Sequence, residues 1–383
     1  MKPQRRLRLG MVGGGEGAFI GAVHRLAARM DDRYELVAGA FSSSLENCQR
    51  TGAALWLDPA RCYASYQKMA AQEAAREDGI DVVAIVTPNF LHAPVATAFL
   101  QAGIHVICDK PLCLNAQQAS QLAAVVKQSQ CQFILTHNYS AYPLIREARQ
   151  RVLSGELGEI RFVEVEYLQD WMSELVEQTD NKQASWRGEP AKAGAGCIGD
   201  VGTHAWQLAS FVSGMLPQSL SAELATVVAG RALDDDVRVT LRYANGARGR
   251  LWASQVASGH ENSLRLRIYG SEASLEFQQE NPNQLWIRPR NAPAYCLTRG
   301  SGVLSDEVRT MGRVPAGHPE GYLEGFGQIY REAADQIWAA IDGQPFSGSL
   351  LPGIDDGVAG MKFIDAVRHS SAADGKWVDF SAA

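Results

Sequence analysis

A lysine follows a short apolar stretch that is expected to form a buried strand. Residues 105–108, His-Val-Ile-Cys, lead directly into Asp109, Lys110 and Pro111. Open parallel sheets bind their ligands beyond the carboxyl ends of the strands. This position makes Lys110 a candidate for chemistry on a bound small molecule. The competing interpretation is a loop lysine that is merely solvated.

An aspartate and a histidine stand four residues apart in a segment that is expected to open a helix. Asp200 and His204 follow the glycine-rich run that begins at Gly194. Residues at i and i+4 share one helical face, and a carboxylate in the first turn is favoured by the helix dipole. An aspartate there can orient a histidine that acts as general base on a hydroxyl. The competing interpretation is a helix-stabilising aspartate beside a packed core histidine.

The first part of the chain alternates short apolar runs with helical stretches. The expected strands are 7–12, 36–40, 82–86, 104–108 and 133–135. The run 82–86 is apolar without alternation, which is typical of a parallel strand that is covered on both faces. Strands that alternate with helices predict a doubly wound α/β domain with a Rossmann-like sheet over residues 1–137.

The remainder of the chain, residues 138–383, predicts an α+β domain with a large, mainly antiparallel sheet. Val163, Val165 and Tyr167 alternate with glutamates, which indicates a strand with two unlike faces. Asn245-Gly246 lies between two alternating runs and predicts a hairpin. Further strands are expected at 264–268, 273–277 and 285–287, and helices at 142–153, 322–341 and 356–370.

A glycine-rich turn follows the first strand and predicts a dinucleotide site. Gly13 and Gly15 fit the G-x-G-x-x-G pattern, whereas the third glycine arrives late, at Gly21. Glycines at this place let the backbone approach a pyrophosphate at a helix N-terminus. The second strand ends in Ser42, Ser43 and Ser44, where NAD-binding proteins usually carry an acid. This favours NADP slightly and leaves NAD open.

Thr87, Pro88 and Asn89 follow the third strand, and His92 enters the next helix. Asn89 is expected either to cap that helix or to bind the nicotinamide ribose, and the two roles are compatible.

Composition limits the remaining classes of function. The chain has 383 residues, 46% apolar and 20% charged, with a net charge of -6. This balance fits a globular protein and argues against a nucleic-acid partner. No apolar run is long enough for a membrane span or a secretory signal, so a cytoplasmic location is expected. The seven cysteines show no metal-binding spacing, so we expect reduced thiols and no metal site.

Taken together, these segments resemble the Gfo/Idh/MocA family of oxidoreductases, which includes glucose-fructose oxidoreductase and inositol dehydrogenase. The resemblance runs nearly end to end. It rests on the glycine turn with His24, on Thr87-Pro88-Asn89 with His92, on Asp109-Lys110-Pro111, and on Gly199-Asp200-Val201-Gly202-Thr203-His204. Asp109 stands where the family usually has a glutamate. Gln207 stands where many members carry an acid.

The resemblance implies hydride transfer between a hydroxyl carbon of a sugar, inositol or other polyol and a nicotinamide, with Lys110, Asp200 and His204 as catalytic residues. It leaves open whether Lys110 or His204 handles the proton. Trp186 and Arg187 join these three as expected substrate contacts. The expected cofactor-binding residues are Gly13, Gly15, Gly17, Phe19, Ile20, Ser42, Ser43, Thr87, Pro88, Asn89, His92, Asp109, Lys110 and Asn138. A homodimer or homotetramer formed through an uncovered face of the second domain's sheet is also expected.

Two other functions compete with a dehydrogenase. One is a protein that senses or binds NAD(P) without chemistry. The other is a glycosidase that uses NAD for transient oxidation without net redox change. The presence of Lys110, Asp200 and His204 together counts against a sensor, which has no need of groups that move a proton.

Overall fold

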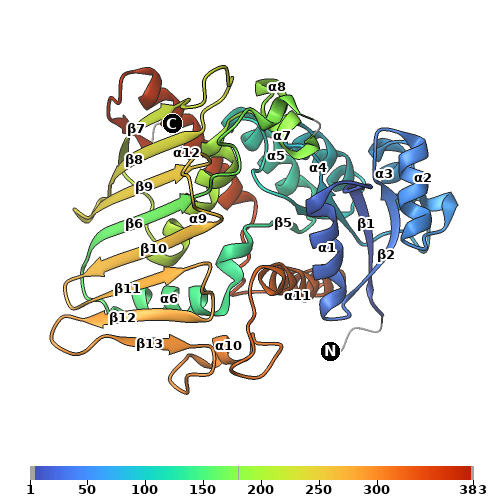
Figure 1. Cartoon of the computed structure of the whole chain (residues 1–383). Coiled ribbons are helices and arrows are strands. Elements are labelled where there is room, and N and C mark those ends of the chain that lie inside the picture. The colour runs from blue at the N-terminus through green and yellow to red at the C-terminus, as the bar shows by residue number, and fades with distance from the viewer. Residues whose placement is uncertain (1–4, 180, 381–383) are drawn as a thin grey trace. The chain divides into compact units, whose positions relative to one another are not determined.

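The computed structural model describes residues 5–179 and 181–380, which form two compact units (Figure 1). The first unit comprises the chain up to Thr136 with Ala191–Gly194 and Phe326–Met361. The second comprises His137–Pro190, Ala195–Gly325 and the chain from Lys362. The expected division into residues 1–137 and 138–383 is simpler than this arrangement, because it omits the return of Phe326–Met361 to the first unit.

The first unit contains a five-stranded parallel sheet with the order β2-β1-β3-β4-β5. Its strands are β1 (Leu7–Gly13), β2 (Tyr34–Ala40), β3 (Val82–Val86), β4 (His105–Cys108) and β5 (Phe133–Leu135). Gly13 pairs with Val86, and Ile85 pairs with Cys108. The carboxyl ends of β1, β3 and β4 therefore reach one edge of the sheet together. The loops that carry the predicted cofactor residues and Lys110 begin at this edge.

Helices pack around this sheet. They are α1 (Phe19–Met30), α2 (Leu45–Ala54), α3 (Tyr66–Ala74), α4 (His92–Gln101), α5 (Ala116–Ser129) and most of α11 (Tyr322–Ile341), with the short turns η1 (Pro59–Arg61) and η2 (Asn89–Leu91). Polar contacts join α1 to α11 inside the core. The Nδ1 atom of buried His24 lies 2.9 Å from the hydroxyl of Tyr330, and Tyr34 donates to the carbonyl of Tyr330. These contacts explain how a late helix becomes part of the first unit.

The second unit is built on a nine-stranded sheet with the order β13-β12-β11-β10-β6-β9-β8-β7-β14. Its strands are β6 (Ile160–Leu168), β7 (Ser219–Ala225), β8 (Asp236–Arg242), β9 (Arg248–Ser254), β10 (Ser263–Gly270), β11 (Ala273–Gln278), β12 (Gln284–Pro289), β13 (Tyr295–Thr298) and β14 (Val378–Asp379). Among the described strands of this nine-stranded sheet, only β6 and β9 pair in parallel.

Helices of the second unit lie against one face of this sheet, and the other face is open (Figure 1). The helical segments are η3 (Asn138–Ala141), α6 (Pro143–Leu153), η4 (Val176–Gln178), α7 (Lys182–Arg187), α8 (Pro190–Ala193), the π-helix η5 (Ile198–Gly202), α9 (Thr203–Ser213), α10 (Asp306–Arg309) and α12 (Ile354–Ala372), of which α8 and α12 are shared with the first unit. Trp206 of α9 stacks on Phe363 of α12, with ring centroids 5.1 Å apart. Buried residues alternate with charged ones along the strands, as the period-two pattern predicts.

The predicted fold class is confirmed, and most predicted elements lie within a few residues of their expected places. The hairpin at Asn245-Gly246 joins β8 to β9. All seven cysteines are free, and five of them are buried. Over the described part of the chain, no helix is both long and apolar enough to cross a membrane.

The buried histidine of the first unit predicts a loss of stability in acid. Burial lowers the pKa of His24 from 6.5 to about 4, against an opposing effect of Asp109. Between these pH values an unfolded chain binds a proton that the folded chain does not. The free energy of unfolding should therefore fall as the pH is lowered through this window, by up to about 3 kcal/mol from this group.

Urea unfolding followed by tryptophan fluorescence at several pH values will check this. His24→Asn should weaken the dependence on pH, since asparagine can still meet Tyr330 but does not titrate. An unchanged slope in that variant would show that other groups cause the acid sensitivity.

Candidate active site

The glycine-rich turn after β1 is shaped by backbone conformations that favour glycine. Gly13, Gly14 and Gly17 have φ angles of 84°, 70° and 81°. A Cβ atom on Gly21 would lie 2.4 Å from the Cα atom of Gly14. Gly21 thus provides the close packing of helix on strand that the third glycine of the motif provides. Its late position lengthens the turn without removing this contact.

Helix α2, which follows β2, forms an ion pair with the glycine-rich turn. Arg50 Nε of α2 lies 2.5 Å from Glu16 Oε2. Ser44 caps α2 by accepting a hydrogen bond from the backbone of Asn47, and Ser42 accepts one from the backbone of Ser44. An arginine near the predicted ribose site is therefore already engaged by a carboxylate.

The loop after β3 corrects one expectation for Asn89. The helix α4 begins at His92 with Leu91 as its N-cap, and no side chain caps it. Asn89 Nδ2 instead donates to the carbonyl of Ala193, at 2.9 Å. The capping interpretation is therefore wrong. The hydroxyl of Thr87 is buried and has no hydrogen-bond partner among the described residues.

The loop after β4 is anchored on both sides of Lys110. Asp109 accepts hydrogen bonds from the backbone N–H of Lys110, at 2.9 Å, and from the hydroxyl of Thr136, at 3.0 Å. The Lys110–Pro111 peptide bond is cis. The carbonyl of Pro111 lies 2.7 Å from Nδ1 of His92. The backbone around the predicted catalytic lysine is thus tied to neighbouring elements at two points.

In the second unit, Asp200 lies in a π-helical turn rather than in the first turn of an α-helix. The π-helix spans Ile198–Gly202, and α9 begins at Thr203. The simple i, i+4 spacing expected from the sequence is therefore modified, because a π-turn has more residues per turn. Single π-turns of this kind are frequent at functional sites. His204 belongs to the regular helix that follows.

Gln255 and Arg187 both hold the carboxylate of Asp200. Gln255 Nε2 donates to Asp200 Oδ2 at 2.9 Å, and Arg187 Nε lies 3.3 Å from the same oxygen. Gln255 is buried at the end of β9, whereas Arg187 stacks on Trp186 with its guanidinium 4.4 Å from the ring centroid. Arg187 and Trp186, which were expected at the substrate, thus form a packed pair that reaches Asp200.

A second aspartate fixes the backbone that leads into the π-turn. Asp234 accepts hydrogen bonds from the N–H groups of Gly196 and Ile198, at 2.9 and 2.8 Å, and its carbonyl accepts one from Cys197. Burial raises the pKa of Asp234, against these hydrogen bonds, which lower it. A Cβ atom on Gly196 would lie 2.1 Å from the carbonyl oxygen of Asp234, so this close contact requires glycine.

Aromatic rings surround His204. The ring centroids of Tyr139, His137 and Tyr167 lie 5.0, 5.6 and 6.2 Å from that of His204. The hydroxyls of the two tyrosines are 2.7 Å apart, and Tyr167 donates to Asn262. Burial raises the pKa of both tyrosines, so they stay neutral near neutral pH. A histidine packed this way has a defined ring orientation, as a general base requires.

Two buried amides in this unit add potential ligand contacts. Asn138 Nδ2 and Gln207 Nε2 are buried and have no hydrogen-bond partner within the described part of the chain. Buried polar atoms are usually paired in native proteins. These two amides, like the hydroxyl of Thr87, therefore fit the contacts that a dinucleotide or a hydroxylated substrate would make.

Sequence reasoning missed several of these groups. Asp234, Gln255 and Tyr167 carry no motif and reach the site through the folding of the second unit. His137 and Tyr139 had a signal, since they follow a parallel strand, but Asn138 alone was chosen from that segment.

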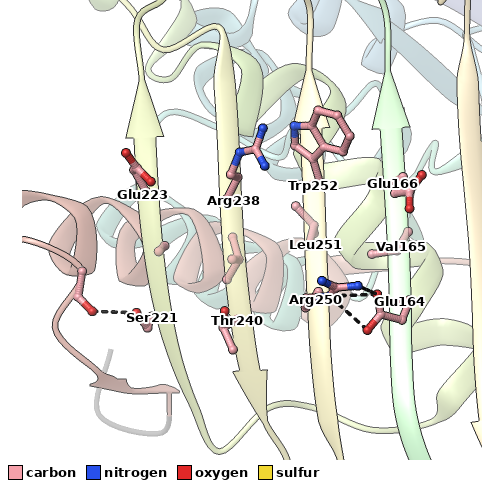
Figure 2. Close-up of a pocket in the computed structure, with 13 residues that line it drawn as sticks. Glu164, Val165, Glu166, Ser221, Glu223, Arg238, Thr240, Arg250, Leu251 and Trp252 are labelled. Carbon is pink, nitrogen blue, oxygen red and sulfur yellow. Dashed lines mark hydrogen bonds and ion pairs between the residues drawn. The ribbon is translucent and has the colours of Figure 1, made fainter. Parts of the chain in front are cut away.

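A hollow on the open face of the nine-stranded sheet contains none of the predicted catalytic or cofactor-binding residues. It lies over β6 to β9 and is lined by charged side chains and one tryptophan (Figure 2). Arg250 Nη2 pairs there with Glu164 Oε2 at 2.7 Å, and Trp252 donates to Asp236. The residues that line the hollow therefore lie on a sheet face where charged side chains form ion pairs with one another.

Comparisons with known proteins agree with the expected family. A model described as an oxidoreductase family with an NAD-binding Rossmann fold matches residues 7–137, and a GFO/IDH/MocA C-terminal domain matches residues 145–276. The uncharacterized oxidoreductase YfiI of Bacillus subtilis (strain 168) is 33% identical over 98% of this chain and 97% of its own length. Levoglucosan dehydrogenase of Pseudarthrobacter phenanthrenivorans is 29% identical over 98% of both chains.

Solved structures show the same likeness. An inositol dehydrogenase homolog from Azotobacter vinelandii complexed with NAD+ is 36% identical, with a TM-score of 0.95 over 99% of this chain and 98% of that one. Its complex with NADH and myo-inositol gives a TM-score of 0.92 over 98% of both chains. The prediction of an NAD(P)-dependent dehydrogenase that acts on a CH–OH group is confirmed at the level of the family. On these matches, the chain belongs to the GFO/IDH/MocA family of NAD-binding oxidoreductases.

Proposed function

We propose that this protein oxidises a secondary hydroxyl of a cyclic polyol or sugar, with NAD+ as the acceptor of the hydride. The observation that carries the proposal is that the second unit holds a carboxylate fixed by Gln255, Asp200, four residues before a histidine packed among aromatic rings, His204. The molecules bound in the complexes of two relatives, myo-inositol and levoglucosan, support the substrate class, since both are compact rings that carry several hydroxyls.

Each proposed catalytic residue has a separate task. His204 takes the proton of the substrate hydroxyl as general base. Lys110 donates a hydrogen bond to the same oxygen and stabilises the negative charge that develops on it. Asp200, fixed by Gln255 and Arg187, keeps the histidine in the orientation for proton transfer. The bound nicotinamide supplies the acceptor for the hydride.

The first unit's polar groups fit a dinucleotide. The positive φ angles of Gly13 and Gly17 allow a backbone cradle for the pyrophosphate. The unpaired hydroxyl of Thr87 is a donor suited to the ribose or the nicotinamide. The other expected cofactor contacts stay predictions, except that of His92, whose two ring nitrogens face backbone carbonyls.

We propose NAD rather than NADP as the natural cofactor, although the serines after β2 favour NADP slightly. Arg50 is paired with Glu16, so binding a 2′-phosphate would require this pair to break beside a carboxylate that repels the phosphate. The NAD+ and NADH complexes of the 36% identical homolog support the same choice.

The open face of the nine-stranded sheet is proposed to bind a second copy of this chain. Both charge signs alternate across it, as in the pairs Arg250–Glu164 and Arg265–Glu276, so the face is complementary to itself. Exposed Phe162 and Trp286 add the aromatic contacts typical of interfaces. A homodimer or homotetramer would form through this face.

A cytoplasmic location stays a prediction.

A panel of inositols, aldoses and anhydrosugars will test the reaction, with NAD+ and NADP+ supplied separately and reduced nicotinamide measured by absorbance. We expect turnover with at least one cyclic polyol or sugar and a preference for NAD+. Protein that retains tightly bound NAD, forms no reduced cofactor and cleaves glycosides would support the redox-neutral glycosidase instead. Binding without any turnover would support a sensor.

The role of Lys110 predicts a specific kinetic defect. Lys110→Met should lower kcat by about 100- to 1,000-fold, since a donor to the developing charge is lost. The Kd for NAD+, measured by calorimetry, should stay within about threefold, because the hydrogen bond is made to the substrate. Lys68→Met, at an exposed position on α3, is the matched control and should behave as wild type. A large loss of NAD+ affinity in the Lys110 variant would place this residue at the cofactor instead.

If the open face is the interface, the exposed aromatic residue Phe162 should be required for self-association. Phe162→Asp should convert the oligomer into a monomer, because it places a charge in the contact without disturbing the core of the unit. Light scattering after size exclusion will report the mass. Val303→Asp, at another exposed apolar position, should leave the mass unchanged. If Phe162→Asp keeps the wild-type mass, the open face is not the interface.

A further inference from the structure

A buried histidine joins the two loops that carry the predicted nicotinamide contacts and the catalytic lysine. The Nδ1 atom of His92 lies 2.7 Å from the carbonyl oxygen of Pro111, and its Nε2 atom lies 2.9 Å from that of Thr87. The side chain is 1% exposed. Both ring nitrogens are therefore engaged inside the protein, which leaves them unsuited to the direct cofactor contact expected from the sequence.

The contact of His92 with the Pro111 carbonyl fixes a backbone segment that has few other groups able to form hydrogen bonds. Proline has no N–H group, so its carbonyl is the only backbone group of Pro111 that can form a hydrogen bond. On the other side of Lys110, the Asp109 N–H donates to the carbonyl of Ile85 at 2.9 Å. Lys110 thus lies between one anchor on β3 and one anchor on His92.

The same histidine is the first residue of α4, which packs beside β3 and β4. Its position is therefore set by a helix rather than by a loop. Carbonyl oxygens only accept hydrogen bonds, and a neutral imidazole has one N–H to donate. Burial lowers the pKa of His92, with opposing effects of Asp109 and of the two carbonyls. A neutral ring then donates to one of its two carbonyls at a time.

We propose that His92 is a positioning residue, which aims Lys110 at the substrate oxygen by donating a hydrogen bond from Nδ1 to the carbonyl of Pro111. This inference rests on the proposed role of Lys110. Loss of the bond would let the loop relax while the lysine itself remains. Displacement of a catalytic group by about 1 Å can cost about 100-fold in rate.

Three substitutions separate the contact with Pro111 from the contact with Thr87. His92→Asn keeps a donor near the position of Nδ1 and can reach Pro111. His92→Gln keeps a donor near the position of Nε2 and can reach Thr87. His92→Phe keeps the ring shape and neither donor. We expect kcat within about threefold of wild type for the asparagine variant and about 10- to 100-fold lower for the other two, with the KM for NAD+ changed less than about threefold in all three.

Hydrogen exchange measured by mass spectrometry gives a readout that does not depend on catalysis. The amides of residues 109, 110 and 112–114 should exchange faster in His92→Gln and His92→Phe than in wild type, and at the wild-type rate in His92→Asn. If the phenylalanine variant does not fold, the asparagine and glutamine variants carry the same comparison, since each keeps one donor.

The outcomes distinguish this inference from the proposed function. Wild-type exchange and turnover in all three variants would overturn the positioning role, as would an asparagine variant that behaves like the phenylalanine variant. If exchange follows the expected order while Lys110→Met retains wild-type kcat, then His92 does position the loop and the catalytic assignment of Lys110 is the part that fails.

Discussion

The parallel pairing of β1, β3 and β4 is the constraint on which the candidate site in the first unit depends. Because Gly13 pairs with Val86 and Ile85 with Cys108, the chain leaves all three strands at one edge of the sheet. Buried apolar strands make this register costly to change, because a shift would expose core side chains. The loops at the edge are then fixed by contacts of their own, among them Gly21 against Gly14 and His92 against Pro111.

In the second unit the corresponding task falls to a carboxylate clamp. Asp234 accepts hydrogen bonds from the backbone N–H groups of Gly196 and Ile198, where the π-helix begins, and Gln255 donates to the carboxylate of Asp200 within it. As in the first unit, contacts with other parts of the unit fix the backbone next to the candidate site. Buried polar groups that have several hydrogen-bond partners are held in one geometry. Removing one partner lowers the stability of the fold, because the remaining group is left buried without its hydrogen bond. The proposed catalytic side chains of Asp200 and His204 then extend from a backbone that is held in place.

Local signals in the sequence were sufficient for most of the fold. Alternation revealed β6 and β8, and Asn245-Gly246 revealed their neighbouring hairpin, because both depend on residues close together in the chain. Boundaries differ by one or two residues where helices begin, as at Pro143 and Ile354. The return of Phe326–Met361 to the first unit was not predictable, since the contacts of Tyr330 with His24 span some 306 positions.

The candidate site was predictable only where a motif marks it. Lys110, Asp200 and His204 lie in motifs, whereas Gln255 meets Asp200 across 55 positions and Asp234 looks like part of a solvated acidic run. The π-turn was also missed, because π-helix and α-helix share the same sequence preferences over so few residues. Asn89 shows the converse error, in which a residue type common at caps serves another purpose.

Transfer of a labelled hydride tests the proposed reaction most directly. A substrate found in the panel would be prepared with deuterium on the carbinol carbon and incubated with the protein and NAD+. Mass spectrometry of the reduced cofactor should then show one deuterium for each molecule formed, since the hydride comes from that carbon. Reduced cofactor without deuterium, or deuterium lost to solvent, would contradict direct transfer from the CH–OH carbon.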